Sequence, residues 1–409
     1  MSIVCKCPEM GIKFPEPVRK QGEIRLEVIR DFQGLEKYAH AWNRLACEMD
    51  RNPVLSHAWM SAHLQTRLNL GEQWFCLLAF DGDRLVGVCP IITVPRRWPG
   101  ERHCLRFETP YDIFTTGAVE PLVLQEFASQ VCPAFHAYLW SIPCDCSCLR
   151  IRGLPEERIA HVTNRNVFRQ SSSIVDINSA ESFIPVKDGA EAYFDSLSKN
   201  FLRNYRRIGR RIQEQPDVRF RFDTGNSESN AEQFMDIEHQ GWKAQRKTSI
   251  RSDESYVKFF RLLTKRLEEQ GWLRWAFLDI GDKPVAGQFM VQNGSTLYVV
   301  KIGYDEAFAK LSPGAVLFGH VIEQAFASGE TSEINFMSGY SWMNDWNVQT
   351  RRLADIAFFP DTMRRWGLCK QPIQLRALIN RKPKLKRFIE TGLSFRWKKL
   401  PSLSKKTGV

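Results

Sequence analysis

The stretch YVVKIGYDEAFAKLSPGAVLFG, residues 298–319, decides how this chain folds. A β-branched apolar run gives way to a polar turn, and Ser-Pro-Gly at 312–314 then precedes a second apolar segment. Serine is a favoured N-cap, and proline suits the first helical position because an N–H there would have no partner. We therefore predict a strand over 296–301 and a helix over 313–328. The junction between them would present free amides and the positive end of the helix dipole.

Length and composition set the frame for this junction. The chain has 409 residues and a hydrophobic fraction of 43%, which favours two or three domains over one. Its apolar runs are shorter than the roughly 18 residues of a membrane span, and its N-terminus lacks the layout of a signal peptide. The 11 cysteines are scattered, which favours free thiols in a reducing compartment. We expect a cytoplasmic protein.

The net charge of +11 is concentrated at the C-terminus. Residues 364–409 contain 14 Lys and Arg against one acid, so the rest of the chain is nearly neutral. This basic tail, which alternates charges with apolar residues, is either a solvated extension or a contact for an anionic membrane surface. Nucleic acid is not expected as a partner, because the charge is not accompanied by a zinc-finger spacing or an aromatic RNA-binding signature.

The chain contains two similar hairpins. WFCLLAFDGDRLVGVCPIITV (74–94) and LRWAFLDIGDKPVAGQFMVQ (273–292) share a polar turn followed by a glycine, Gly87 in one and Gly287 in the other. Each hairpin follows two helix-like segments, which suggests a duplicated α+β domain. These segments are 41–49 and 59–68 in the first half, and 231–243 and 255–270 in the second. A further strand is predicted at 333–336.

A basic amphipathic helix is predicted between the two units, over SLSKNFLRNYRRIGRRIQEQ (196–215). Apolar residues recur at helical spacing on one face, and basic residues cover the other. The apolar set is Leu197, Phe201, Tyr205, Ile208 and Ile212; the basic set is Lys199, Arg203, Arg206, Arg207 and Arg210. We predict a packed helix whose basic outer face is free to meet an anionic ligand.

The second half resembles the GNAT superfamily of N-acyltransferases, specifically its CelD-like, BioF2-like branch, which is related to the Fem-type aminoacyl transferases. The first half is similar to the N-terminal half of the same proteins, with WNRL at 42–45 and SHAWM at 56–60, so the resemblance covers roughly residues 27–360. The motifs that carry it are the basic helix, HQGWK (239–243), DKPVAGQF (282–289), LYVVKIGYDEAFAKLSPGAVLFGHVIEQA (297–325) and NFMSG (335–339).

The resemblance implies an α+β fold of tandem GNAT-like domains, each a mixed, mainly antiparallel sheet flanked by helices. We expect an N-terminal extension at 1–25, a first GNAT-like domain at 26–185, a second at 186–363 that begins with the basic helix at 195–215, and the tail at 364–409.

The resemblance also implies acetyl-CoA or another acyl-CoA as the cofactor. In GNAT proteins the strand before the pyrophosphate loop splays from its neighbour and aligns the cofactor. The amides of the helix that follows then suit the pyrophosphate. The expected cofactor-binding residues are Val299, Val300, Lys301, Lys310, Ser312, Pro313, Gly314 and Ala315.

Acyl transfer to an amine requires a deprotonated amine, a stabilised oxyanion and a proton donor for the leaving thiolate. The candidate bases are Glu238 and His239, followed by Asp305. Tyr304 or Tyr340 is the candidate acid, and transfer through water without a dedicated base stays open.

The acceptor is expected near aromatic residues that follow the last core strand. The chain departs from the family there: in GYSWMNDWN (339–347), Asn344 stands near the position of a family lysine. The candidate substrate-binding residues are Trp242, Lys243, Trp342, Asn344 and Trp346.

No metal site is predicted. CDCSC (144–148) places three cysteines on one face of a strand, but a nearby CxxC or histidine pair that would complete a tetrahedral set is missing from the sequence. Buried free thiols are expected there.

The expected function is acyl-CoA-dependent N-acyl transfer to an amine of a cell-envelope or exopolysaccharide precursor, or of a related small acceptor. Two alternatives stay open: a Fem-like aminoacyl-tRNA-dependent transferase, and a non-catalytic GNAT-fold subunit of a polysaccharide-synthesis assembly. The basic tail adds a possible peripheral position at the inner face of the membrane.

Overall fold

The computed structural model describes Pro15 and residues 24–49, 52–95, 105–111, 120–142, 148–162 and 171–360. The predicted basic tail lies outside the described residues, as does nearly all of the predicted N-terminal extension. Cys144 and Cys146 lie outside them too, while Cys148 is a buried free thiol.

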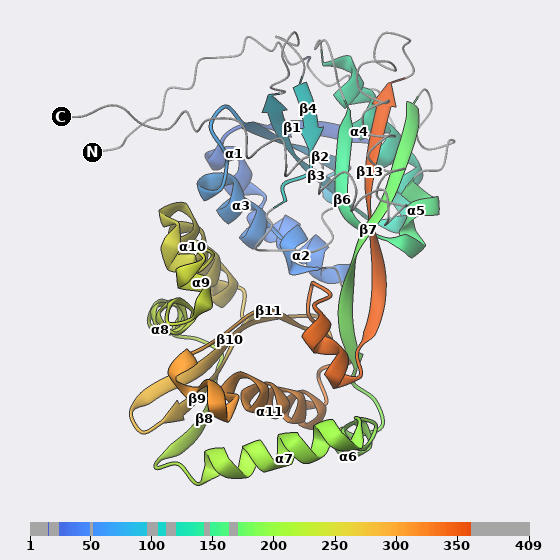
Figure 1. Cartoon of the computed structure of the whole chain (residues 1–409). Coiled ribbons are helices and arrows are strands. Elements are labelled where there is room, and N and C mark those ends of the chain that lie inside the picture. Colours follow the sequence, from blue (N-terminus) through green and yellow to red (C-terminus); the bar gives the residue numbers. More distant parts are fainter. Residues whose placement is uncertain are drawn as a thin grey trace, which may run out of the picture.

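Strands and helices alternate through both halves of the chain (Figure 1). The strands are β1 (Arg25–Ile29), β2 (Gln73–Asp81), β3 (Arg84–Pro95), β4 (Leu105–Glu108), β5 (Leu122–Val123), β6 (Leu149–Pro155), β7 (Ser171–Pro185), β8 (Val218–Asp223), β9 (Leu273–Ile280), β10 (Lys283–Asn293), β11 (Thr296–Tyr304), β12 (Glu333–Asn335) and β13 (Gln349–Pro360). The α-helices are α1 (Phe32–Lys37), α2 (Ala39–Glu48), α3 (His57–Thr66), α4 (Ala128–Ser141), α5 (Glu156–Val162), α6 (Ala190–Asp195), α7 (Lys199–Gln213), α8 (Ser227–His239), α9 (Trp242–Gln245), α10 (Glu254–Glu269) and α11 (Pro313–Ser328). Short 3₁₀ helices are η1 (Pro53–Leu55), η2 (Gln125–Phe127), η3 (Ile250–Ser252), η4 (Glu306–Leu311) and η5 (Ser341–Trp346).

The strands of the described residues form one mixed sheet. Its order is β1-β2-β3-β4-β6-β13-β7-β12-β11-β10-β9-β8, with β5 paired to β3. Most neighbours are antiparallel, and the parallel pairs are β4 with β6 and β11 with β12. The predicted α+β fold of two GNAT-like halves is confirmed.

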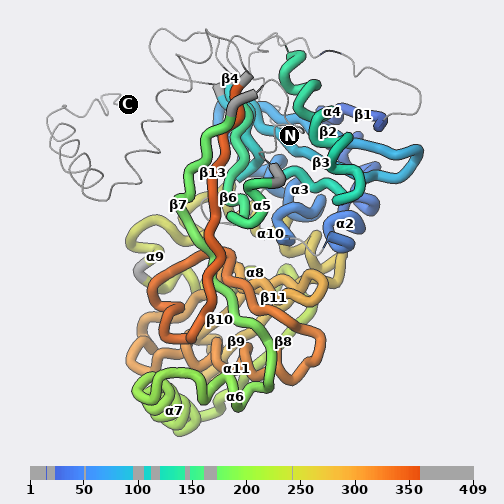
Figure 2. The backbone as a smooth tube through the Cα atoms, turned by 90° about the vertical axis from the view of Figure 1, so that its right-hand side faces the viewer, coloured from blue at the N-terminus to red at the C-terminus, as the bar shows by residue number. Residues whose placement is uncertain are grey.

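A long antiparallel pair joins the two halves. β7 and β13 pair from Ser171 opposite Pro360 to Phe183 opposite Gln349. Figure 2 shows these two strands side by side, passing from the N-terminal half (β1 to α5) down to the C-terminal half (α6 to η5). At its C-terminal end β7 also pairs with β12, and β13 pairs with β6 on its other side. The sheet is therefore continuous through both halves.

Helices cover both faces of the sheet in the C-terminal half. α8 and α10 lie on the side of the N-terminal half, where α10 packs against α3 (Figure 1). The rings of Trp59 in α3 and Phe259 in α10 meet edge-on at 6.3 Å between centroids. α11 covers the opposite face, and α7 lies beyond it. A shared apolar core thus fixes how the halves meet.

The two hairpin glycines are not equivalent, contrary to the expectation from sequence. Gly87 pairs with Ala79, two residues before the turn pair formed by Asp81 and Arg84, whereas Gly287 pairs with Phe277, three residues before the corresponding pair. Successive strand residues point to opposite faces, so this one-residue offset turns the two glycines to opposite sides of the sheet. A Cβ on Gly87 would meet Val131 of α4, and one on Gly287 would meet Phe234 of α8.

No helix among the described residues combines the length and the apolar character needed to cross a bilayer.

Candidate functional site

β11 and β12 run together for only three residue pairs. Thr296 lies opposite Glu333, and Tyr298 lies opposite Asn335. Bonds between Ser295 and Ser332 hold the closed end: the Ser332 N–H donates to the Ser295 carbonyl at 2.7 Å, and the two hydroxyl oxygens lie 2.8 Å apart. Along the edge of β11 that faces β12, residues 299–304 pair with no strand among the described residues. The two strands therefore form a V that opens toward α11.

A bulge bends β11 just beyond this point. Lys301 pairs with Phe289 and Val299 pairs with Met290, so Val300 is the extra residue. A bulge increases the local twist and leaves one residue outside the ladder. The backbone of Val299 and Val300 is consequently placed where β11 leaves β12.

The junction at the open end of the V is built by η4. Asp305 caps η4: its carboxylate accepts from the Ala307 N–H at 2.9 Å and from Lys283 Nζ at 2.6 Å. Burial alone would raise the pKa of Asp305, but the bonds from Lys283 and Ala307 outweigh it and lower the pKa. This arrangement fixes the turn from β11 into α11.

Ser312 stands at the N-cap of α11, but its side chain makes no capping bond. Its backbone is left-handed, with φ 45°, so the extended N-cap geometry that aims a hydroxyl at the first turn is absent. Its carbonyl accepts from the Ala315 and Val316 N–H groups. Pro313 is the first helical residue, as expected. The first turn of α11 thus lacks a side-chain cap. Pro313 has no N–H, and the Ala315 and Val316 N–H groups are already bonded, so the Gly314 N–H and the helix dipole are what the turn presents to an external anion.

Gly314 brings α11 close to β11. It is buried, and a Cβ on it would lie 3.4 Å from Tyr304 Cδ1 and 3.9 Å from Ile302 Cγ2. The predicted Tyr304 and Gly314 are therefore neighbours. Lys310 is exposed on η4, three residues before the start of α11 at Pro313.

A buried charged cluster links α8 and α9 to β11. Glu238 Oε1 accepts from Lys243 Nζ and Lys301 Nζ, each at 3.0 Å, and Glu238 Oε2 accepts from the Ile250 N–H at 2.9 Å. Burial opposes the charged form of Glu238, but the two ammonium groups outweigh it and lower the pKa of Glu238. Three of the predicted site residues thus meet here.

The two lysines differ in their surroundings. Burial would lower the pKa of Lys301, but Tyr256, whose ring centroid lies 5.3 Å from Nζ, and Glu238 raise it above its ordinary value. The pKa of Lys243 is lowered by burial despite Glu238. Lys243 Nζ also donates to the Ile302 carbonyl at 2.9 Å. Lys243 therefore binds the backbone of β11 within the segment that has left β12.

The other predicted catalytic residues lie apart from this cluster. His239 Nδ1 is 2.8 Å from Ser249 Oγ, and the His239 side chain is exposed at the end of α8. Tyr340 is 60% exposed in the loop after β12. None of these roles is tested by position alone, and each stays a prediction.

The predicted acceptor residues separate into core and surface positions. Trp346 is buried, and its ring meets Phe318 edge-on at 4.7 Å. Trp342 is 43% exposed and lies edge-on to Phe318 and Phe336, both at 6.3 Å. Asn344 is exposed on η5. Trp242 begins α9, and its side chain lies outside the described part of the chain.

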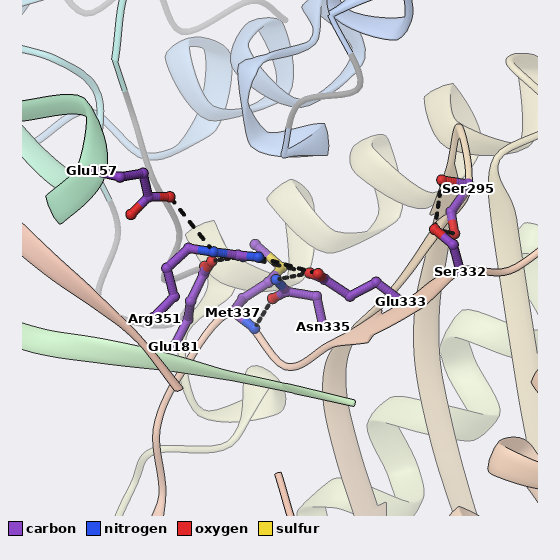
Figure 3. A network of polar contacts seen from close by, with 8 residues as sticks. All are labelled: Glu157, Glu181, Ser295, Ser332, Glu333, Asn335, Met337 and Arg351. Atoms are coloured by element: carbon purple, nitrogen blue, oxygen red, sulfur yellow. Dashed lines mark hydrogen bonds and ion pairs between the residues drawn. The ribbon is translucent and has the colours of Figure 1, made fainter. Parts of the chain in front are cut away.

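A polar network at the vertex of the V was not predicted from sequence (Figure 3). Arg351 of β13 binds Glu181 of β7 at 2.6 Å and Glu333 of β12 at 3.1 Å, and it faces Glu157 of α5 at 3.7 Å. Asn335 closes the end of β12 by accepting from the Met337 N–H at 2.7 Å. Burial raises the pKa of Glu181 even though Arg351 opposes the shift. The network ties strands of both halves together where β11 and β12 part.

A comparison with known protein families matches the part of the chain that contains the V. Residues 199–345 match the family described as "Acetyltransferase (GNAT) domain". No curated protein matches the chain.

Two solved structures share the fold at low sequence identity. The crystal structure of FemX superposes with a TM-score of 0.57 at 7% identity, over 84% of this chain and 100% of that one. The C-terminal DUF2156 domain of a putative lysylphosphatidylglycerol synthetase from Agrobacterium fabrum superposes with a TM-score of 0.51 at 8% identity, over 84% of this chain and 96% of that one. The part of the chain from 199 to 345, which contains α7, β11 and α11, is therefore similar to GNAT acetyltransferase domains.

Proposed function

We propose that this protein is an acyl-CoA-dependent N-acyltransferase of the CelD-like, BioF2-like branch. The observation that carries the proposal is the parting of β11 from β12 beside an N-terminus of α11 that lacks a side-chain cap. The free edge of β11 offers backbone N–H and C=O groups to the amide-bearing arm of the donor, as a strand edge does to a peptide. The pyrophosphate then lies at the first turn of α11, where the Gly314 N–H and the helix dipole favour an anion.

The reaction follows from this placement. The acceptor nitrogen attacks the thioester carbonyl, a C–N bond forms, and the C–S bond breaks. The developing oxyanion lies at the bulge, where the backbone of Val299 and Val300 supplies the N–H donors. The thiolate takes a proton from Tyr304 or Tyr340.

The proton of the acceptor amine leaves to water in this scheme. Glu238 was the first candidate base, but its oxygens already accept from Lys243, Lys301 and Ile250, and the lysines lower its pKa. A carboxylate held ionised in this way is a weak base. We assign Glu238 the role of holding α8 and α9 against β11.

For the acceptor, we propose an amine on a sugar of a cell-envelope or exopolysaccharide precursor. The exposed rings of Tyr340 and Trp342 support a sugar, because such rings offer an apolar face with a polar edge. Their loop follows β12 directly, next to the V.

Calorimetry with acetyl-CoA tests the donor. Ala315→Glu adds a negative charge to the first turn of α11, where it favours the helix but repels a pyrophosphate. We expect it to weaken acetyl-CoA binding at least about tenfold. Because Ala315 is half-buried against the core, thermal melting checks that the variant is folded. The matched control is Gln324→Glu, the same charge change on an exposed position farther along α11. If Ala315→Glu and the parent protein bind acetyl-CoA with equal affinity, the donor does not bind at this junction.

An aminoacyl-tRNA donor is the second candidate, and the basic outer face of α7 favours it. Binding of tRNA would fall steeply with salt, because phosphate contacts release counterions. Filter binding at 50 and 200 mM salt, beside acetyl-CoA calorimetry, decides between the two donors: binding of tRNA alone would replace the acyl-CoA proposal.

A further inference from the structure

A groove runs between α7 and α11 on the face of the sheet away from the N-terminal half. It holds about 670 Å³ and is bounded at one side by β8. Its lining residues come from three elements: Lys199, Leu202, Arg203, Tyr205, Arg206, Gly209, Arg210 and Gln213 of α7; Phe220 of β8; and Val316, His320 and Glu323 of α11.

Four cations form a row along this groove. Lys199, Arg203, Arg206 and Arg210 follow one another at spacings of three or four residues, which places them on one helical face over roughly 16 Å. Among the described residues, none of the four forms an ion pair with a carboxylate, and Arg203 donates to Asn200 at 3.1 Å. By contrast, Arg251 and Arg351 of the same half are each paired to glutamates. The row is therefore available to an anion from outside.

The opposite wall is aromatic. The rings of Phe220 and His320 lie 3.8 Å apart between centroids, and His320 Nδ1 is 3.0 Å from Glu323. A flat ring such as a nucleobase stacks on a wall of this kind. A Cβ on Gly209 would meet no atom within 4 Å, so the middle of the groove is open.

The floor of the groove is fixed by close packing. A Cβ on Gly319 would lie 1.9 Å from Tyr205 Oη, so the glycine is what lets α7 approach α11. The groove also reaches the first turn of α11, because Val316 lines it.

We propose that the groove binds a phosphorylated nucleotide, the nucleotide end of the acyl donor. This inference rests on the proposed function. The cations hold the phosphate groups and the wall formed by Phe220 and His320 holds the base. The volume lies in the range of small-ligand pockets, which favours a single nucleotide over an RNA strand.

The test uses the full chain and two probes, adenosine 3′,5′-bisphosphate and acetyl-CoA, in calorimetric titrations. Arg206→Gln combined with Arg210→Gln removes two cations from the groove. Arg207→Gln combined with Arg211→Gln is the matched control: it removes the same charge from the same helix, at residues that do not line the groove. Because hydrogen bonds to charged groups contribute strongly, we expect the groove pair to weaken both probes by roughly a hundredfold and the control pair by less than about threefold.

The outcomes separate this inference from the proposed function. If acetyl-CoA binds the parent and the groove pair equally, the groove inference is wrong and the proposed function stands. If acetyl-CoA binds neither, the proposed function fails and this inference fails with it. If a short RNA hairpin loses binding in the groove pair while acetyl-CoA does not, RNA is the occupant and the nucleotide inference is wrong. Circular dichroism melting checks that all four exposed substitutions keep the fold.

Discussion

The two halves of this protein contain similar strands and helices, but they differ in how the space beside these elements is filled. In the N-terminal half β4 and β6 are parallel for two residue pairs, and α4 lies on the sheet as α11 does in the other half. The space beneath α4 is a cavity of only about 50 Å³, lined largely by apolar groups and thiols. In the C-terminal half the strand edge and helix N-terminus are open. Similar strands and helices thus enclose a filled core in the N-terminal half, and they leave a strand edge and a helix start open in the C-terminal half.

The starts of the two helices illustrate the difference. α4 follows η2 without a side-chain cap, after the largely apolar stretch Leu122–Leu124, and its second turn contains Pro133. α11 follows a left-handed serine, a proline and a glycine that packs on β11. Gly314 lets the start of α11 lie close to β11, while α4 begins with the small residues Ala128 and Ser129 only after the bulky Phe127.

The largest expected effect breaks the charged cluster of the C-terminal half. Glu238→Gln removes the carboxylate that pairs with both Lys243 and Lys301, so the free energy of unfolding should fall by about 3 kcal/mol or more. Urea unfolding measures it. Asp236→Asn is the control on the same helix: its partner Arg251 is near the surface, and the loss should stay below about 1 kcal/mol.

A second variant keeps that prediction testable if Glu238→Gln does not fold. Adding Lys301→Met removes one of the two buried cations and should restore part of the lost stability. A double variant less stable than the single one would show that the cluster does not act through charge balance.

The next effect concerns the N-terminal half alone. His136 lies on the buried face of α4, and burial lowers its pKa to about 4 from the ordinary 6.5. Between these values the unfolded chain binds more protons, so the free energy of unfolding should fall as the pH drops, by about 2 kcal/mol from pH 7 to pH 5. Urea unfolding of the parent and of His136→Leu at both pH values measures it. An equal drop in the two proteins would contradict a buried neutral histidine.

A smaller effect on stability distinguishes two glycines in the packed helices α7 and α11. The described residues of the N-terminal half contain no such helix pair. Gly319→Ala pushes a Cβ into Tyr205 and should cost about 1–3 kcal/mol of unfolding free energy. Gly209→Ala meets open space in the interior of α7 and should stabilise by up to about 1 kcal/mol. Thermal unfolding of both variants tests the signs, and the same sign for both would contradict the packing described.

Much of the fold could be predicted from local patterns. The helix expected over 313–328 is α11 with the same bounds, and the strand expected at 296–301 extends to Tyr304. Capping residues and apolar periodicity act over a few positions, so a single sequence carries them. The offset between Gly87 and Gly287 could have been read from the sequence: Gly87 follows Arg84 by three residues, and Gly287 follows Lys283 by four. Both second strands carry one bulge, so the bulges do not cause the offset.

The site could be predicted only in part. The motif around 298–319 located the junction, and HQGWK contained Lys243, which meets Glu238 and Lys301. The network of Arg351 could not be predicted, because Glu157, Glu181 and Glu333 are brought to it by the crossing of β7 and β13. The basic face of α7 was expected, but the groove that it forms with α11 depends on packing.

The central claim is that the acyl donor lies on the free edge of β11 and at the start of α11, and that the similar elements of the N-terminal half bind nothing of the kind. Hydrogen–deuterium exchange, followed by mass spectrometry with and without saturating acetyl-CoA, tests it most directly. Slower exchange is predicted in peptides covering 299–316, with no change in peptides covering 105–111 and 128–141. Protection of the N-terminal peptides, or unchanged exchange across 299–316 at saturation, would contradict the account.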